Sequence, residues 1–159
     1  MRGEAVAERS LIRCEVEGAY QNEVDTSALR QAASACLEHL EEDDSALSVI
    51  LIGDQRMQEL NLRYRGVDRP TDVLAFSVDF QDPDLEARYL GDVLISVPRA
   101  RAQAADRNHD LQAELQLLVV HGTLHLLGFD HLEEDEKKDM FSRQAEILEQ
   151  MGVEVDIKA

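Results

Sequence analysis

The stretch DLQAELQLLVVHGTLHLLGFDH, from Asp110 to His131, decides how this chain folds. Most of its second half is apolar, which is typical of a helix at the centre of a hydrophobic core. We expect this helix to start at Asp110 and to end at Gly128, where a left-handed cap can turn the chain back. The other elements are expected to pack around it.

Outside this helix, shorter segments alternate between strand and helix patterns. Apolar or partly alternating runs predict strands at Leu11–Val16, Leu47–Ile52, Val73–Val78 and Leu90–Val97. Further helices are expected, one with Ser27 as its N-cap and others that start near Asp54, Pro98 and about Glu133. The acidic segment DFQDPDLEARY is expected to be an exposed hairpin connection. This order predicts an α+β fold in which helices pack on a small mixed, roughly four-stranded sheet.

Length and composition limit the organisation of the chain. With 159 residues and 44% hydrophobic content, we expect a single domain that spans residues 1–159. Cys14 and Cys36 cannot form a disulfide framework, and the charged segment MRGEAVAERS lacks the apolar run of a signal peptide. No segment approaches the roughly 20 consecutive apolar residues of a membrane span. These features predict a cytoplasmic protein.

The chain is strongly acidic, with 33 acidic and 16 basic residues and a formal net charge of −17. A field of this sign repels polyanions at long range and argues against a general nucleic-acid binder. Because salt screens exposed charges beyond about 8–10 Å, a local basic groove is still compatible with this composition. Arg63, Arg65 and Arg69 form such a cluster, whereas the arginines between Arg99 and Arg107 are expected to be surface charges.

Three of the five histidines, His121, His125 and His131, fall within eleven residues. Histidines four residues apart lie on one face of a helix, and the turn at Gly128 can bring His131 back to the same point. Imidazole suits zinc, and three neutral imidazoles leave a fourth tetrahedral position for water. We therefore predict one Zn²⁺ per chain at the end of the central helix. The alternatives are core histidines without metal, or a closed structural site with Asp130 as a fourth ligand.

The spacing H-x-x-x-H-x-x-G-x-x-H is that of the metzincin peptidases, in which a Glu after the first His is the general base. Gly122 occupies that position here and cannot transfer a proton. A glycine inside a helix also costs roughly 1 kcal/mol relative to alanine, which indicates that a substrate or a neighbouring strand approaches the backbone there. The motif therefore predicts the geometry of a metal site and disfavours peptidase chemistry of the usual kind.

Together with its flanking segments, HGTLHLLGFDH resembles the signature of the YbeY family of bacterial endoribonucleases. The segments NLRYRGVDRPTDVLAF (Asn61–Phe76), LGDVLIS (Leu90–Ser96) and EL..LVVHG (Glu114–Gly122) occur in the order and spacing of that family. The resemblance covers roughly residues 45–150. Ala75 and Ser77 stand where the family commonly has Ser and Pro, and neither is a ligand.

The resemblance implies a metal-dependent endoribonuclease that acts on single-stranded RNA in the maturation of small-subunit ribosomal RNA and in ribosome quality control. It also implies zinc on His121, His125 and His131, and an important arginine at Arg65. Zinc lowers the pKa of a bound water to ~7, so that hydroxide can attack phosphorus or take the proton of the ribose 2′-OH. A guanidinium opposite the metal would stabilise the charge that either route builds on the phosphate.

We expect Arg65 to be catalytic, and Arg63 and Arg69 to contact phosphates of the substrate. Ligating histidines usually donate their second N–H to a carboxylate or carbonyl, which makes nearby acidic residues candidates for orienting them. These candidates are Asp72, Asp92, Glu114 and Asp130. The motif itself contains no general base.

Two other functions fit the same residues. One is a metzincin-like metallopeptidase or another zinc hydrolase, and the other is a non-catalytic ribosome-assembly factor in which the metal only stabilises the fold. The expected partners are single-stranded RNA and ribosomal RNA. The negative charge also favours a basic protein partner, and a ribosomal protein or an assembly GTPase would fit the role of the family.

Overall fold

Four strands form one sheet in the order β1-β2-β4-β3 in the computed structural model, which describes residues 11–82 and 87–155. The strands are β1 (Leu11–Val16), β2 (Ser45–Ile52), β3 (Val73–Asp82) and β4 (Ala87–Ser96). β2 pairs in parallel with both β1 and β4, and β3 pairs antiparallel with β4. The expected mixed, four-stranded sheet is therefore confirmed, and β3 forms one of its edges.

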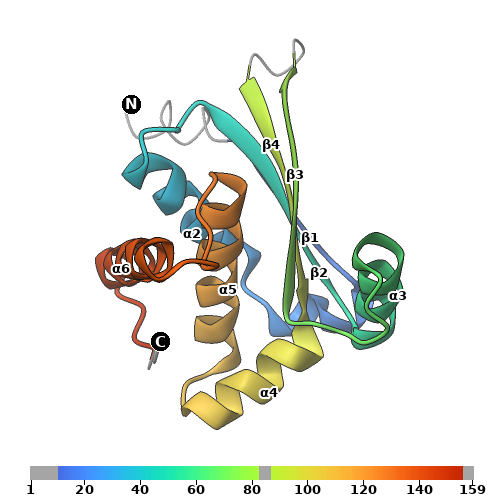
Figure 1. The fold of residues 1–159 in the computed structure, drawn as a ribbon. Helices are drawn as coiled ribbons and strands as arrows, with labels where there is room; N and C mark the ends of the chain where they lie inside the picture. Colours follow the sequence, from blue (N-terminus) through green and yellow to red (C-terminus); the bar gives the residue numbers. More distant parts are fainter. Residues whose placement is uncertain (1–10, 83–86, 156–159) are drawn as a thin grey trace.

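Helices cover both faces of this sheet unequally. They are η1 (Gly18–Glu23, a 3₁₀ helix), α2 (Thr26–His39), α3 (Asp54–Arg65), α4 (Val97–Arg107), α5 (Leu111–Leu126) and α6 (Glu134–Gln150). Figure 1 shows α2, α5 and α6 together on one face and α3 alone on the other. The fold is α+β, as the sequence predicts. None of the described helices meets the length and hydropathy needed to cross a membrane.

The main core lies between α5 and the sheet. α5 buries Leu115, Leu118, Val120 and Leu124, and each such side chain contributes about 1.5–3 kcal/mol through burial of apolar surface. β2 is buried along nearly its whole length, because a parallel strand in the middle of the sheet is covered on both faces. α5 is thus fixed against β3 and β4, and this contact determines where its histidines lie.

The β3–β4 hairpin corrects the expected loop in DFQDPDLEARY. β3 continues to Asp82 and β4 begins at Ala87, so that the strands pair well beyond the predicted ends. Cross-strand hydrogen bonds override the acidic composition, because alternate positions of an edge hairpin can face water. The register shifts between Ser77 and Phe80. The rest of the predicted connection, residues 83–86, lies outside the described residues.

Candidate metal centre

The end of α5 brings three imidazoles together. His121 and His125 lie one helical turn apart on the same face, with ring centroids 4.8 Å from each other. The ring of His131 returns to this pair, 5.6 Å from that of His121 and 5.1 Å from that of His125. One nitrogen from each ring lies within 4.8 Å of the others, which is close enough for the three to hold one metal ion.

The chain turns back toward α5 through a glycine cap. Gly128 has a φ of +99°, and its N–H donates to the carbonyl of His125 at 3.0 Å. The N–H of Phe129 donates to the carbonyl of Leu124, also at 3.0 Å. These two bonds are those of a Schellman motif, which satisfies the last carbonyls of a helix while it reverses the chain. The cap thereby carries His131 back over the last turn of α5.

His121 is held by a residue that the sequence reasoning did not select. Its Nδ1–H donates to the Oε1 of Gln144 at 2.9 Å, and Gln144 is only 2% exposed on α6. A neutral imidazole with its proton on Nδ1 presents the lone pair of Nε2 to a metal. One signal for Gln144 exists in the sequence, because it is a polar residue within the apolar stripe formed by Met140, Ile147 and Leu148. Buried polar groups in such a stripe need a partner.

The electrostatics of the cluster favour uncharged imidazoles. Burial lowers the pKa of His121 and that of His125 below the ordinary value of 6.5. The positive charge that a neighbouring imidazole would carry acts in the same direction for both. The hydrogen bond to Gln144 opposes this effect at His121, and the carboxylate of Asp130 opposes it at His125. Neutral imidazole is the form that binds metal, so the site is ready for an ion at neutral pH.

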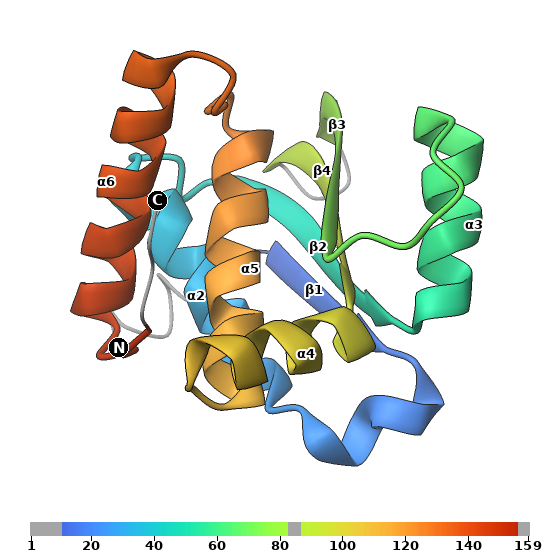
Figure 2. The ribbon, with the colours of Figure 1, turned by 60° about the horizontal axis from the view of Figure 1, so that its bottom comes forward.

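The histidines open onto a cleft of about 500 Å³. Its walls include Arg65, Asp72 and Asp130 in addition to the three histidines, and part of β3 from Val73 to Ser77. Arg65 is the last residue of α3, whose end is capped by Gly66. In Figure 2, β3 stands between α5 and α3, and this strand is an edge of the sheet. The arginine that the sequence selected thus lies on the same cleft as the three imidazoles.

Arg63 and Arg69 are not among the residues that line this cleft. The guanidinium of Arg63 lies over the ring of Tyr64, 5.7 Å from its centroid. Arg69 contributes its backbone carbonyl, which accepts a hydrogen bond from Nδ2 of the buried Asn61 at 2.8 Å. Contacts of these two arginines with phosphates therefore stay predictions for a region outside the cleft wall.

Among the four candidate carboxylates, Asp72 and Asp130 lie on the cleft. Asp130 accepts the backbone N–H of His131 at 2.7 Å and so orders the returning chain. Asp72 accepts the backbone N–H of Val73 at 2.8 Å, and its charge raises the pKa of His121. Both carboxylates act on the histidines through charge or backbone, and neither shows a hydrogen bond to an imidazole ring among the described contacts.

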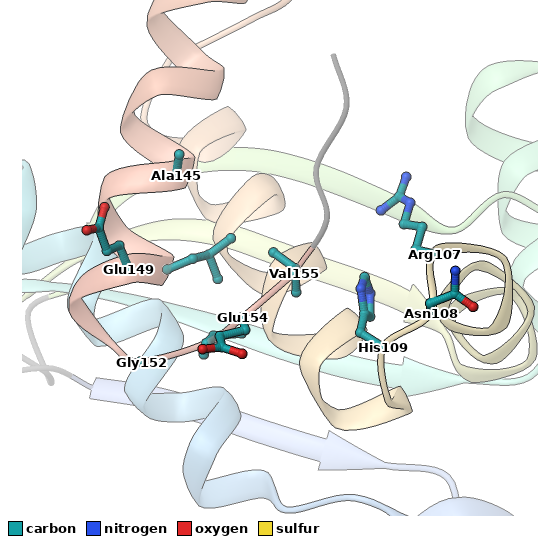
Figure 3. Close-up of a pocket in the computed structure, with 10 residues that line it drawn as sticks. Arg107, Asn108, His109, Ala145, Glu149, Gly152, Glu154 and Val155 are labelled. Carbon is teal, nitrogen blue, oxygen red and sulfur yellow. The ribbon is translucent and has the colours of Figure 1, made fainter.

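Asp92 and Glu114 lie elsewhere. Asp92 accepts the hydroxyl proton of Tyr89. Glu114 is fully buried and accepts hydrogen bonds from Arg107 at 3.1 Å and from His109 at 2.5 Å. Figure 3 shows Arg107 and His109 in a separate pocket formed by the α4–α5 connection and the end of α6. Seven residues along a helix span about 10 Å, so Glu114 cannot reach His121 although both lie on α5.

Gly122 lies where the helix touches the sheet. A Cβ atom at this position would lie 2.5 Å from Cγ1 of Val93 on β4 and 3.4 Å from Cγ2 of Val73 on β3. Of the two expected neighbours, substrate or strand, the structure shows the strand. The Cβ atom of a glutamate at this position would clash with the sheet, and the backbone of Gly122 also lines the cleft.

The fold and the cleft define an α+β protein with a cluster of three histidines that could hold one metal ion. Its closer class follows from known proteins: the profile of the family Endoribonuclease YbeY matches residues 15–152. The chain belongs to the YbeY endoribonuclease family. The expected enzyme class, a hydrolytic nuclease, is thereby confirmed.

Individual relatives cover most of both chains. Endoribonuclease YbeY of Desulfitobacterium hafniense is 48% identical over 119 residues, which are 71% of this chain and 76% of that protein. Endoribonuclease YbeY of Bacillus cereus (strain G9842) is 41% identical over 146 residues, or 87% and 91% of the two chains. A protein of Thermotoga maritima with a known solution structure is 31% identical and matches with a TM-score of 0.60 over 88% of each chain. The similarity therefore extends over the fold as well as the motif.

Proposed function

We propose that this protein is a zinc-dependent endoribonuclease that cleaves single-stranded RNA in the maturation of small-subunit ribosomal RNA and in ribosome quality control. The observation that carries the proposal is a single cleft on which three imidazoles and the guanidinium of Arg65 meet. An RNA phosphate that enters this cleft would find a metal ion on one side and a fixed cation on the other. Membership of the YbeY endoribonuclease family supports the same reaction class.

The donor set fits one zinc ion per chain. Three imidazoles are ligands that zinc accepts, and three protein ligands are typical of a catalytic zinc with an open position. Gln144 fixes the tautomer of His121 that presents Nε2 to an ion. When bound, zinc would polarise a phosphoryl oxygen and lower the pKa of a coordinated water to ~7.

The groups of the chain itself would bind and orient the RNA. Among the described residues, Arg65 forms no ion pair, so its guanidinium is available for phosphate oxygens. A planar guanidinium can bind two oxygens of one phosphate at once and stabilise the charge that develops on them. Arg63 and Arg69 would contact phosphates farther along the strand.

Two variants test this assignment. His125→Ala should lose bound zinc and abolish RNA cleavage, whereas Arg65→Ala should keep zinc and lose cleavage by roughly 10²–10³-fold. Zinc content by elemental analysis and cleavage of a single-stranded RNA oligonucleotide are measured on proteins purified in parallel. Equal cleavage by wild type and His125→Ala would identify a contaminating nuclease and overturn the proposal.

The alternatives make different predictions. A metallopeptidase would cleave peptides when loaded with zinc, but the contact of Gly122 with Val93 leaves no space for its general base. In a non-catalytic assembly factor, Arg65→Ala would leave RNA processing intact, while chelation of the metal would unfold the chain. Intact RNA processing by Arg65→Ala would favour the non-catalytic assembly factor over the endoribonuclease.

We further propose that residues 1–159 act as one hydrolase domain in the cytoplasm. The net charge of −17 favours a basic partner, for which a ribosomal protein or an assembly GTPase is the candidate. Co-purification from ribosome-containing extracts, compared at low and high salt, checks this expectation, because an electrostatic contact should weaken as salt rises.

A further inference from the structure

Tyr64 is an exposed aromatic residue beside the cleft. It is 59% exposed, and among the side chains that the structure describes it is the only exposed aromatic one. Aromatic residues make up only 4% of the chain. Single exposed apolar side chains are common on protein surfaces, so what Tyr64 can bind depends on the groups around its ring.

The ring is held in place although it is exposed. The ring of Phe76 meets it edge to face, with centroids 5.2 Å apart and planes at 64°. Phe76 itself packs against the small core beneath α3, which contains Met57 and Leu94. The guanidinium of Arg63 lies 5.7 Å from the Tyr64 centroid. A tyrosine that is already oriented loses little conformational entropy when it binds a flat ligand.

β3 lies between the ring of Tyr64 and the three histidines. Phe76 of this strand packs against Tyr64, and other residues of β3 line the cleft. Val73, Leu74, Ala75 and Ser77 line the cleft, whereas Phe76 packs against the small core beneath α3. Tyr64 is also directly followed by Arg65, which lines the cleft. Because β3 is an edge strand, a ligand can pass over its outer side from the cleft toward Tyr64. Figure 2 shows this strand between α5 and α3.

The charge around Tyr64 suits a polyanion. Within the described part of the chain, neither Arg63 nor Arg69 forms an ion pair. By contrast, the arginines of α4 are paired: Arg99 with Asp54, Arg101 with Glu23 and Arg107 with Glu114. The only acidic side chain between Arg63 and Arg69, Asp68, accepts a hydrogen bond from Gln58. The guanidinium of Arg63, without an ion pair and beside the exposed ring of Tyr64, gives the combination that binds single-stranded RNA, a phosphate on the cation and a base on the ring.

The geometry points to Tyr64 as a stacking platform, supported by Phe76, for one base of the RNA next to the phosphate held in the cleft. This inference rests on the proposed endoribonuclease function and adds a positioning role to it. A strand that crosses the edge of β3 would place its reacting phosphate at the histidines and a neighbouring base on Tyr64. The platform would accept any base, since every base has a flat face.

Steady-state cleavage of a single-stranded RNA oligonucleotide by the zinc-loaded protein tests the inference. Tyr64→Ala should raise KM by about 5- to 100-fold, with kcat and zinc content near wild type, because one base stack is worth ~1–3 kcal/mol. Tyr64→Phe should keep the wild-type KM. Leu11→Ala, which removes an exposed apolar side chain at the opposite edge of the sheet, is the matched control and should change nothing.

RNA with a single abasic nucleotide, moved along the sequence, locates the stacked base. For wild type, one position should reproduce the KM of Tyr64→Ala, and the same RNA should cause no further loss in Tyr64→Ala. A wild-type KM for Tyr64→Ala, or an abasic penalty that persists in this variant, overturns the platform. Cleavage that survives His125→Ala would instead overturn the proposed function, so that the two failures are distinguishable.

Discussion

At the scale of single residues, the position of the three histidines depends on the residues that pack directly behind them. Gly122 follows His121 and lies against Val93 of β4, with no space for a Cβ between them. Because the backbone of α5 approaches the sheet this closely, His121 and His125 are held at the level of the cleft floor formed by β3. A small change at this contact should therefore affect both stability and metal binding.

Gly122→Ala tests this contact. Alanine is the better helix former by roughly 1 kcal/mol, but overpacking in a core costs ~1–3 kcal/mol, and the Cβ would lie 2.5 Å from Val93. We expect a net loss of about 1 kcal/mol in the free energy of unfolding by urea, together with weaker zinc binding. In a Val93→Ala background the same substitution should cost less, because the opposing methyl groups are gone. Equal costs in both backgrounds would contradict the role of this contact.

The hydrogen bond between Gln144 and His121 leads to a second prediction at the scale of single residues. Gln144→Leu removes the acceptor for His121 Nδ1–H and should weaken zinc affinity about 10- to 100-fold, the usual effect of losing such a partner. Competition with a chromogenic chelator measures this affinity. Gln144→Glu keeps an acceptor and should retain most of it, whereas similar losses in both variants would indicate a packing defect.

At the scale of elements, the site is a helix end joined to a returning turn. α5 places two of the histidines on one face through its own periodicity, and the Schellman motif at Gly128 returns the third to them. The start of another helix shows how local chemistry decides a boundary. The predicted cap at Ser27 is wrong by two residues, because Asp25 accepts the N–H of Ala28 and thereby caps α2.

Gly128→Ala addresses the turn. A φ of +99° is strained for any residue with a Cβ, so we expect a loss of about 1 kcal/mol in stability and a larger relative loss of zinc affinity, because His131 is displaced. Gly152→Ala is the control, since Gly152 also has a positive φ of +74° but lies at the end of α6. Both variants should lose stability in urea unfolding. Zinc affinity should fall only in Gly128→Ala, and an equal fall in both would contradict the turn's role.

At the scale of the whole molecule, the cores on the two faces of the sheet position different parts of the site. The large core holds α5, which carries two of the histidines, and the small core holds α3, which ends with Tyr64 and Arg65. The cleft forms where these two halves meet along β3. Arg107 and His109 bind the buried Glu114 at the distant end of α5, and none of the three lines the cleft.

Two cysteine thiols and one tyrosine hydroxyl predict how the stability of the folded chain responds to alkaline pH. Burial raises the pKa of Cys14 from 9.0 to about 11, raises that of Cys36 further, and raises that of Tyr89 from 10.0 to about 12. The folded chain therefore keeps protons that the unfolded chain releases. This stabilisation is complete below about pH 9 and is lost as pH rises through the folded pKa values.

The urea midpoint should accordingly fall between about pH 9 and about pH 11, and fall less steeply in Cys36→Ala. Urea unfolding, followed by circular dichroism at a series of fixed pH values, measures the midpoint of the wild type and that of Cys36→Ala. Cys36→Ala removes one of the groups whose pKa is raised in the folded chain. If the urea midpoint of this variant fell with pH as steeply as that of the wild type, the thiol of Cys36 would not contribute.

Much of the fold and the three imidazoles could be predicted because they depend on short-range geometry. A helix advances by about 100° per residue, so His121 and His125 share a face in any helix, and a glycine at its end favours the turn that returns His131. Apolar runs likewise predicted all four strands of the sheet. The family resemblance rested on the same contiguous segments, and the family is confirmed.

The sequence by itself therefore determined the class of the fold, the clustering of the three histidines and the family. Only the tertiary structure decided which distant residues complete the site. Gln144 reaches His121 across 23 positions of the chain, and Arg65 reaches the cleft from the opposite side of β3, whereas Asp92 and Glu114 turn to other partners. Contacts between separate elements depend on how helices pack on the sheet, and no local periodicity encodes that packing.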